Sequence, residues 1–157
     1  MNPINVEEKL KDLKLALPPA PGLGGVYTQV REFGTNMFYV SGCVPNIPGG
    51  EIFSGKVGKE YTLEDGQRAA KMATLNMLAV MKKNIGDLRK IKRIVKLLCF
   101  VASDNDFYKQ PAVANAASEL LVAIFGAEVG MGARSAVGVN VLPDNIPFEI
   151  ELLGELY

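Results

Sequence analysis

The sequence predicts one α+β domain, a mixed sheet with two helices on one of its faces. Three observations lead to this prediction. Strand-like and helix-like segments follow one another in the order β-β-α-β-α-β-β after an N-terminal appendage. Two long amphipathic segments each precede an apolar strand-like segment, as helices that pack on one sheet do. The chain has 157 residues, of which 48% are hydrophobic, so it can bury one sizeable core.

The N-terminal segment predicts a short helix over residues 5–16, because a valine and several leucines recur there at helical spacing. The proline-rich stretch 18–21 ends this helix and begins an extended linker. We therefore interpret residues 1–24 as a helix and linker that pack on the domain formed by residues 25–157.

Two strands are expected next, over residues 26–32 and 37–42, with a turn over 34–36 between them. A loop rich in glycine and proline follows over residues 46–60. Such a loop suits either a flap over a pocket or an ordered surface loop, and we favour the surface loop.

The first long helix begins at Thr62, which is a good N-cap residue and is followed by acidic residues in the first turn. Gly86 is the expected C-terminal stop. Small residues such as Ala70 and Ala73 lie on the apolar stripe, so this helix should pack closely on the sheet. The second helix should open at Pro111 and end at Gly126.

The segment 91–102 between these helices is apolar at both odd and even positions. A strand of this kind is covered on both faces. The helices supply one cover, and the other must be a second layer or another subunit.

The C-terminal residues 133–152 read as two strands joined by a turn over 143–147. We expect a hairpin in which Val141 lies opposite Phe148, which places Glu149 opposite Asn140. In that register Arg134 and Glu149 are on the order of 20 Å apart. Both can then act on one small substrate only if one of them comes from a neighbouring subunit.

One face of this hairpin is expected to carry the small residues Ala136 and Gly138 together with Arg134, Glu149 and Glu151. Small residues let another backbone approach closely. On such a face an arginine either binds an anionic ligand or forms a structural salt bridge to one of the two carboxylates, and the residues alone leave both alternatives open.

Composition excludes several classes of protein. The chain has no histidine, which excludes Ser-His-Asp and Cys-His catalysis and removes the commonest zinc ligand. Cys43 and Cys99 are too few for a disulfide scaffold. Lys plus Arg equals Asp plus Glu at 17 each, so no bulk charge attracts nucleic acid or a membrane. With no segment expected to span a bilayer or act as a leader, we expect a soluble cytoplasmic protein.

A cluster of basic residues is the one feature that favours RNA. It lacks interleaved aromatic residues and spans a helix end, where cations are common, so we interpret it mainly as a solvated charge run. Its members are Lys82, Lys83, Arg89, Lys90, Lys92, Arg93 and Lys96.

Three motifs together resemble one protein family. Residues 133–143 read Ala-Arg-Ser-Ala-Val-x-Val-x-x-Leu-Pro and are followed by Glu-Ile-Glu at 149–151. With Tyr-Val-Ser-Gly at 39–42 and Asn-Asp-Phe at 105–107, this pattern resembles the reactive intermediate deaminase family, also called Rid, YjgF or "endoribonuclease L-PSP". The resemblance begins near residue 27 and points to a longer-chain subgroup.

The resemblance implies a chorismate-mutase-like fold, a homotrimer and a site between subunits. Arg134 would bind the substrate carboxylate, and Glu149, or Glu151 beside it, would place the attacking water. The backbone of Gly42 and the side chains of Asn115 and Tyr27 would line the pocket. At position 136, where several members carry cysteine, this chain has alanine, which argues against a thiol role there.

The leading functional hypothesis is therefore an enamine/imine deaminase that hydrolyses 2-imino acids to 2-keto acids and ammonia. It needs no metal or organic cofactor, because an imine is already electrophilic. A non-catalytic trimer that binds small carboxylates is the second hypothesis, and an endoribonuclease or RNA-binding protein that uses the basic cluster is the third.

Overall fold

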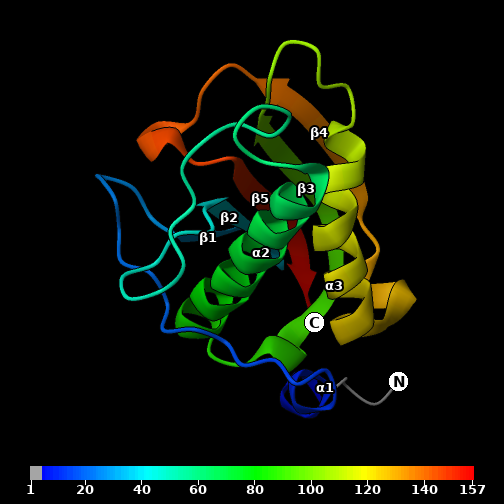
Figure 1. The fold of residues 1–157 in the computed structure, drawn as a ribbon. Helices are drawn as coiled ribbons and strands as arrows, with labels where there is room; N and C mark the ends of the chain where they lie inside the picture. The colour runs from blue at the N-terminus through cyan, green and yellow to red at the C-terminus, as the bar shows by residue number, and fades with distance from the viewer. Residues whose placement is uncertain (1–4) are drawn as a thin grey trace.

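The computed structural model describes residues 5–157, in which two long helices lie across one face of a five-stranded sheet (Figure 1). The strands occur in the spatial order β1-β2-β5-β3-β4. Their bounds are β1 Val30–Phe33, β2 Met37–Cys43, β3 Ile91–Ala102, β4 Ala133–Val139 and β5 Phe148–Leu156. The helices are α1 Val6–Asp12, α2 Leu63–Ile85 and α3 Gln110–Gly130, with single 3₁₀ turns η1 Leu88–Lys90 and η2 Pro143–Asn145.

The predicted element order and the mixed sheet are confirmed. β3 and β4 run parallel and are joined through α3, whereas β1–β2, β2–β5 and β5–β3 are antiparallel pairs. α2 and α3 pack against each other and cover the same face of the sheet (Figure 1).

Local signals explain the ends of the helices. Thr62 and Asp65 form a reciprocal capping box at the start of α2, and Gly86 ends that helix as predicted. Pro111 stands in the first turn of α3. At Gly126 the backbone of α3 leaves helical geometry with φ of 76°, and one further turn carries the segment to Gly130.

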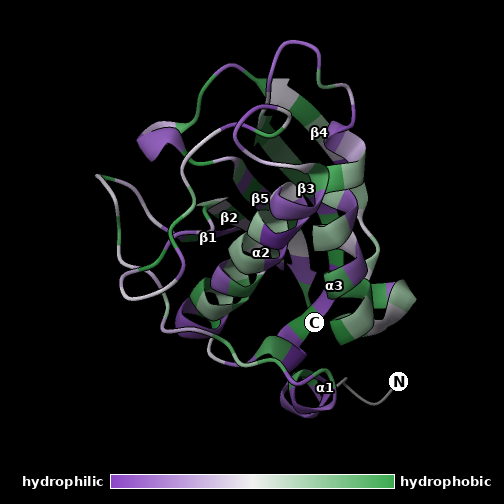
Figure 2. Cartoon of the chain, viewed as in Figure 1, coloured by the Kyte–Doolittle hydropathy of each residue, from purple (hydrophilic) through white to green (hydrophobic). Residues whose placement is uncertain are grey.

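The core lies between the helices and the sheet. Met77, Leu78 and Met81 of α2 and Leu121 and Ile124 of α3 are fully buried. Figure 2 shows hydrophilic residues interrupting the hydrophobic ones along α2, whereas α3 is largely hydrophobic. The pattern along α2 fits a helix that buries one face.

The sequence was expected to hold no segment that could span a bilayer, and the apolar character of α3 corrects that expectation. Its 21 residues are long and apolar enough to cross a bilayer by length and composition. Its buried side chains pack in the core, with Val113, Ala117 and Leu121 fully covered. A core helix of a folded domain has this composition for that reason.

The predicted C-terminal hairpin is wrong. β4 and β5 do not pair with one another, because β3 lies between them and pairs with both. Phe148 lies opposite Val101 and Glu149 opposite Phe100, while Val141 follows the end of β4. On β3, Leu97 and Cys99 are buried under the helices, whereas Leu98 and Phe100 on the other face are only partly covered within this chain, so the second cover predicted for this strand stays a prediction.

Some boundaries also differ. The first strand begins at Val30, so Tyr27 lies in the loop before it, and the N-terminal helix is shorter than predicted. The loop 46–60 is an ordered surface loop, as favoured above. Phe53 and Val57 of this loop are buried, and the Val57 amide donates to the carbonyl of Ala102 at 2.9 Å.

Candidate functional site

Two carboxylates stand on the face of β5 that the helices leave open. Phe148, Ile150 and Leu152 alternate along β5 and are buried on the helix face. Glu149 and Glu151 therefore project to the other face. The sequence pattern placed both glutamates together, and the structure confirms that placement.

Glu149 lies directly over Gly42 of β2. A Cβ atom at position 42 would lie 2.8 Å from Cδ of Glu149 and closer still to Oε1, so only glycine leaves room for the carboxyl group here. Burial, and secondly the negative charge of Glu151, raises the pKa of Glu149 above its ordinary value. Within residues 5–157, the Glu149 carboxylate accepts no hydrogen bond.

Glu151, in contrast, accepts a hydrogen bond from a neighbouring side chain. The hydroxyl of Tyr39 donates to its Oε2 at 2.6 Å. This hydrogen bond, with burial, raises the pKa of Tyr39 to about 12. Of the two glutamates, Glu151 is thus engaged by a neighbour and Glu149 is available to a ligand.

A cavity of about 320 Å³ borders Glu149. Its wall includes Gly42 and Tyr27, so three of the five predicted site residues come together around it. The linker residues Pro21 and Gly22 form another part of the wall, and the side-chain amide of Gln29 donates to the Pro21 carbonyl at 2.8 Å. The extended N-terminal linker therefore closes one side of this cavity.

Arg134 and Asn115 form a separate group. Arg134 is paired with the buried Leu97, so it projects to the helix face, where it contacts α3. Its terminal nitrogens donate to Oγ of Ser118 at 3.0 Å and to the carbonyl of Pro111 at 3.3 Å. Asn115 is exposed and lies on the same side of α3, four residues after Pro111 and three before Ser118.

The expected face of small residues is therefore corrected. Ala136 and Gly138 share a face with Arg134, but that face is turned toward α3, away from Glu149 and Glu151. The small side chains allow α3 to pack closely: a Cβ at position 138 would lie 2.8 Å from Nε2 of Gln110. No ion pair joins Arg134 to a carboxylate among residues 5–157, so the structural salt bridge is absent there.

The strand register fixes the separation of the two groups. Glu149 and Val137 are both paired with Phe100, from opposite sides of β3. Arg134 is thus two strands across from Glu149 and three residues along, which is about 10 Å in each direction. The two side chains also start on opposite faces of the sheet, so one chain does not bring them together.

Sequence reasoning missed two residues that contact the predicted ones. Ser118 lies one helical turn from Asn115, and that spacing could have indicated it. Tyr39 lies within the recognised Tyr-Val-Ser-Gly motif but was not singled out. Its partnership with Glu151 depends on the pairing of β2 with β5, which no local pattern gives.

The two cysteines are unsuited to nucleophilic chemistry. Cys43 borders the cavity, but burial, and then the charges of Glu149 and Glu151, raises the pKa of its thiol to about 12. Burial also raises the pKa of Cys99 to about 12. Within residues 5–157 no group of three or more Cys, Asp or Glu residues is placed to hold a metal ion.

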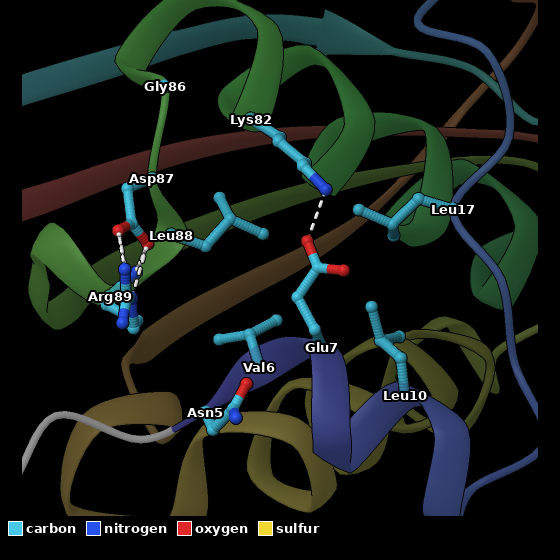
Figure 3. Close-up of a pocket in the computed structure, with 10 residues that line it drawn as sticks. All are labelled: Asn5, Val6, Glu7, Leu10, Leu17, Lys82, Gly86, Asp87, Leu88 and Arg89. Carbon is cyan, nitrogen blue, oxygen red and sulfur yellow. Dashed lines mark hydrogen bonds and ion pairs between the residues drawn. The ribbon is translucent and has the colours of Figure 1, made fainter.

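A larger cavity of about 370 Å³ lies between α1 and the end of α2, and contains none of the predicted site residues (Figure 3). Its charged side chains are paired with each other. Lys82 pairs with Glu7, and Arg89 with Asp87 at 2.7 Å. This cavity marks the docking of α1 rather than a site with free chemical groups.

Ion pairs engage much of the basic cluster, beginning with those of Lys82 and Arg89 just described. Lys92 and Arg93 both pair with Glu155, at 2.9 and 2.6 Å, and Lys96 donates to Ser135 at 2.7 Å. These cations already have partners within the chain. The structure thus gives the RNA hypothesis no additional support.

Comparison with known proteins agrees with the motif pattern. Residues 7–156 match the sequence model of a family described as "YjgF/chorismate mutase-like, putative endoribonuclease". The chain is 38% identical over 151 residues to "Protein TCP17" of Trypanosoma cruzi, covering 96% of this chain and 94% of that protein. It is 32% identical over 138 residues to a 2-iminobutanoate/2-iminopropanoate deaminase of Dermatophagoides farinae, covering 87% and 91%.

Among solved structures, a protein of unknown function from Agrobacterium tumefaciens is similar in both sequence and fold. It is 38% identical, superposes with a TM-score of 0.86, and the match covers 97% of this chain and 94% of that one. The similarity therefore extends over nearly the whole of both chains.

Proposed function

The chain belongs to the YjgF (Rid) family, and we propose that it is an enamine/imine deaminase-like hydrolase that converts reactive 2-imino acids into 2-keto acids and ammonia. The deaminase among its relatives supports this proposal. The observation that carries it is the Glu149 carboxyl group, which lies over Gly42 at the edge of a cavity with no hydrogen-bond partner among residues 5–157.

Glu149 is suited to place and activate water. A general base works best when its pKa lies close to the working pH, and burial moves the pKa of Glu149 upward, in that direction. Glu151, held by Tyr39, instead supplies a fixed negative charge beside it. We therefore assign the water-placing role to Glu149.

Arg134 is suited to hold the substrate carboxylate. A guanidinium is a planar fork that binds a carboxylate through two parallel hydrogen bonds. Asn115, on the side of α3 that carries the two acceptors of Arg134, would complete this half of the site. The other half consists of Glu149, Gly42 and Tyr27.

The two halves would meet between neighbouring chains of a homotrimer. The open face of the sheet supports such an assembly, because Val137 is 40% exposed and Phe100 is only partly covered there. Apolar residues on an uncovered sheet face suit contact with another subunit. A cyclic trimer would place Arg134 of one chain near Glu149 of the next and so form three equivalent sites.

The proposed reaction then follows from these groups. Arg134 holds the carboxylate and Glu149 takes a proton from a water as its oxygen bonds to the imine carbon. Glu149 passes that proton to the imine nitrogen, which gives a tetrahedral intermediate with one hydroxyl and one amino group. The hydroxyl proton then moves to the amino nitrogen, the carbon–nitrogen bond breaks, and ammonia leaves as the carbonyl of the 2-keto acid forms. One water is consumed for each ammonia released.

The direct test is release of ammonia and keto acid from 2-imino acids that an amino-acid oxidase generates in situ. We expect acceleration over the uncatalysed hydrolysis by the native chain and none by Arg134→Ala. Saturable binding of 2-oxobutanoate without any acceleration would instead indicate a non-catalytic carboxylate-binding protein.

A further inference from the structure

Arg134 is attached to α3 at two points. Its two terminal nitrogens each donate one hydrogen bond, to the hydroxyl of Ser118 and to the backbone carbonyl of Pro111. A guanidinium has five N–H donors, so three stay available after these two contacts. The contacts leave enough donors to bind a carboxylate through two of them.

The two acceptors lie seven residues apart on one side of α3, and they fix both ends of the guanidinium. A long arginine side chain otherwise samples many rotamers and loses that freedom when it binds a ligand. Holding the group in advance reduces this entropic cost. Of the two acceptors, only Ser118 is a side chain, so only Ser118 can be removed by substitution.

We propose that Ser118 is a positioning residue, whose hydroxyl holds the Arg134 guanidinium in the orientation that binds the substrate carboxylate. This inference rests on the proposed function, because it assigns Arg134 the carboxylate. Ser118 itself does not touch the reacting atoms. It acts through Arg134, from the helix that also carries Asn115.

The hydroxyl has no competing role within the described chain. Mid-helix serines often donate to the carbonyl four residues earlier, yet the contact formed by Ser118 within residues 5–157 is the one from Arg134. Ser118 is also only partly buried. Its replacement by alanine therefore leaves no large cavity and should not unfold the protein.

The test compares Ser118→Ala, Ser118→Thr and the matched control Glu119→Ala, which alters an exposed neighbour on the same helix. Affinity for 2-oxobutanoate is measured by calorimetry and turnover by ammonia release. We expect Ser118→Ala to weaken binding and raise KM by roughly two- to tenfold, the effect of losing one hydrogen bond. Its kcat should stay within about twofold and its melting temperature should not change.

Ser118→Thr retains the hydroxyl and should restore the affinity, and Glu119→Ala should behave as the native chain. Native affinity in Ser118→Ala, or a loss that Ser118→Thr does not restore, would overturn the inference while leaving the proposed function intact. A native chain that neither binds 2-oxobutanoate nor accelerates imine hydrolysis would overturn both.

Discussion

Arg134 and Glu149 lie on opposite faces of one sheet, two strands apart. β3 separates their strands, and the register pairs Arg134 with Leu97 and Glu149 with Phe100. Successive residues of a strand point to opposite faces, so Leu97 and Phe100 project in opposite directions. The side chains proposed to hold the carboxylate and to place the water thus cannot reach one small molecule within a single chain.

The two glutamates should differ in their contributions to the reaction. Glu149→Gln removes the proposed base and should lower kcat by about 10²-fold or more. Glu151→Gln should retain most of the activity, because Glu151 is engaged by Tyr39. Steady-state kinetics on the two variants distinguishes them, and a greater loss in Glu151→Gln would reverse the assignment.

The pH dependence of Glu151→Gln provides an independent test. The negative charge of Glu151 contributes to the raised pKa of Glu149. Removing that charge lowers the pKa of Glu149, so the base is ionised at lower pH. The acidic limb of the kcat/KM profile should therefore move to lower pH. A limb that stays in place or moves upward would show that a different group controls it.

Gly42→Ala should affect function more than stability. The added Cβ would meet Cδ of Glu149 at 2.8 Å, and a glutamate side chain can rotate away from such a contact. We expect activity to fall by about tenfold or more, because the carboxylate is displaced, with a small change in melting temperature. Full activity in Gly42→Ala would show that the observed position of Glu149 is not required.

Both thiols should be unreactive in the folded protein. Their pKa values of about 12 leave on the order of one thiolate in 10⁴ at pH 8. Titration with a disulfide reagent should detect almost no reaction until a denaturant is added, and then two thiols per chain. Rapid reaction of the native protein at pH 8 would mean that Cys43 or Cys99 is more accessible than this structure indicates.

A charge placed on the open face of the sheet tests whether this face forms the contact between subunits. Val137→Asp puts a carboxylate on the exposed apolar face and should yield a smaller, inactive species in sedimentation velocity. Ile52→Asp is the matched control, because Ile52 is exposed on the loop whose Glu51 pairs with Arg68 of α2. If both variants sedimented like the native chain, Val137 would not lie in a subunit interface.

The sequence predicted the features that depend on local signals. Thr62 and Gly86 mark the ends of α2 correctly, because capping involves only neighbouring residues. The element order and the alternation along β5 were predictable for the same reason. The placement of Glu149 beside Glu151 follows directly from that alternation.

Pairing of distant segments was not predictable in this way. The alternation along β4 and β5 does not reveal that β3 separates them, although the apolar run of β3 was consistent with a central strand. The small residues Ala136 and Gly138 were expected on the same face as Glu149 and Glu151, but they lie on the opposite face, where they make room for α3. The contact of Tyr39 with Glu151 could be found only once β2 and β5 had been placed side by side.

Subunit mixing can show whether each site is shared between two chains. Arg134→Ala and Glu149→Gln chains, each inactive alone, are unfolded together in equal amounts and refolded. In a cyclic trimer every mixed assembly has one cleft with both side chains intact, so activity should return to about a quarter of the native value. Verified mixed trimers that stay inactive would show that Arg134 of one chain and Glu149 of the next do not form a shared site.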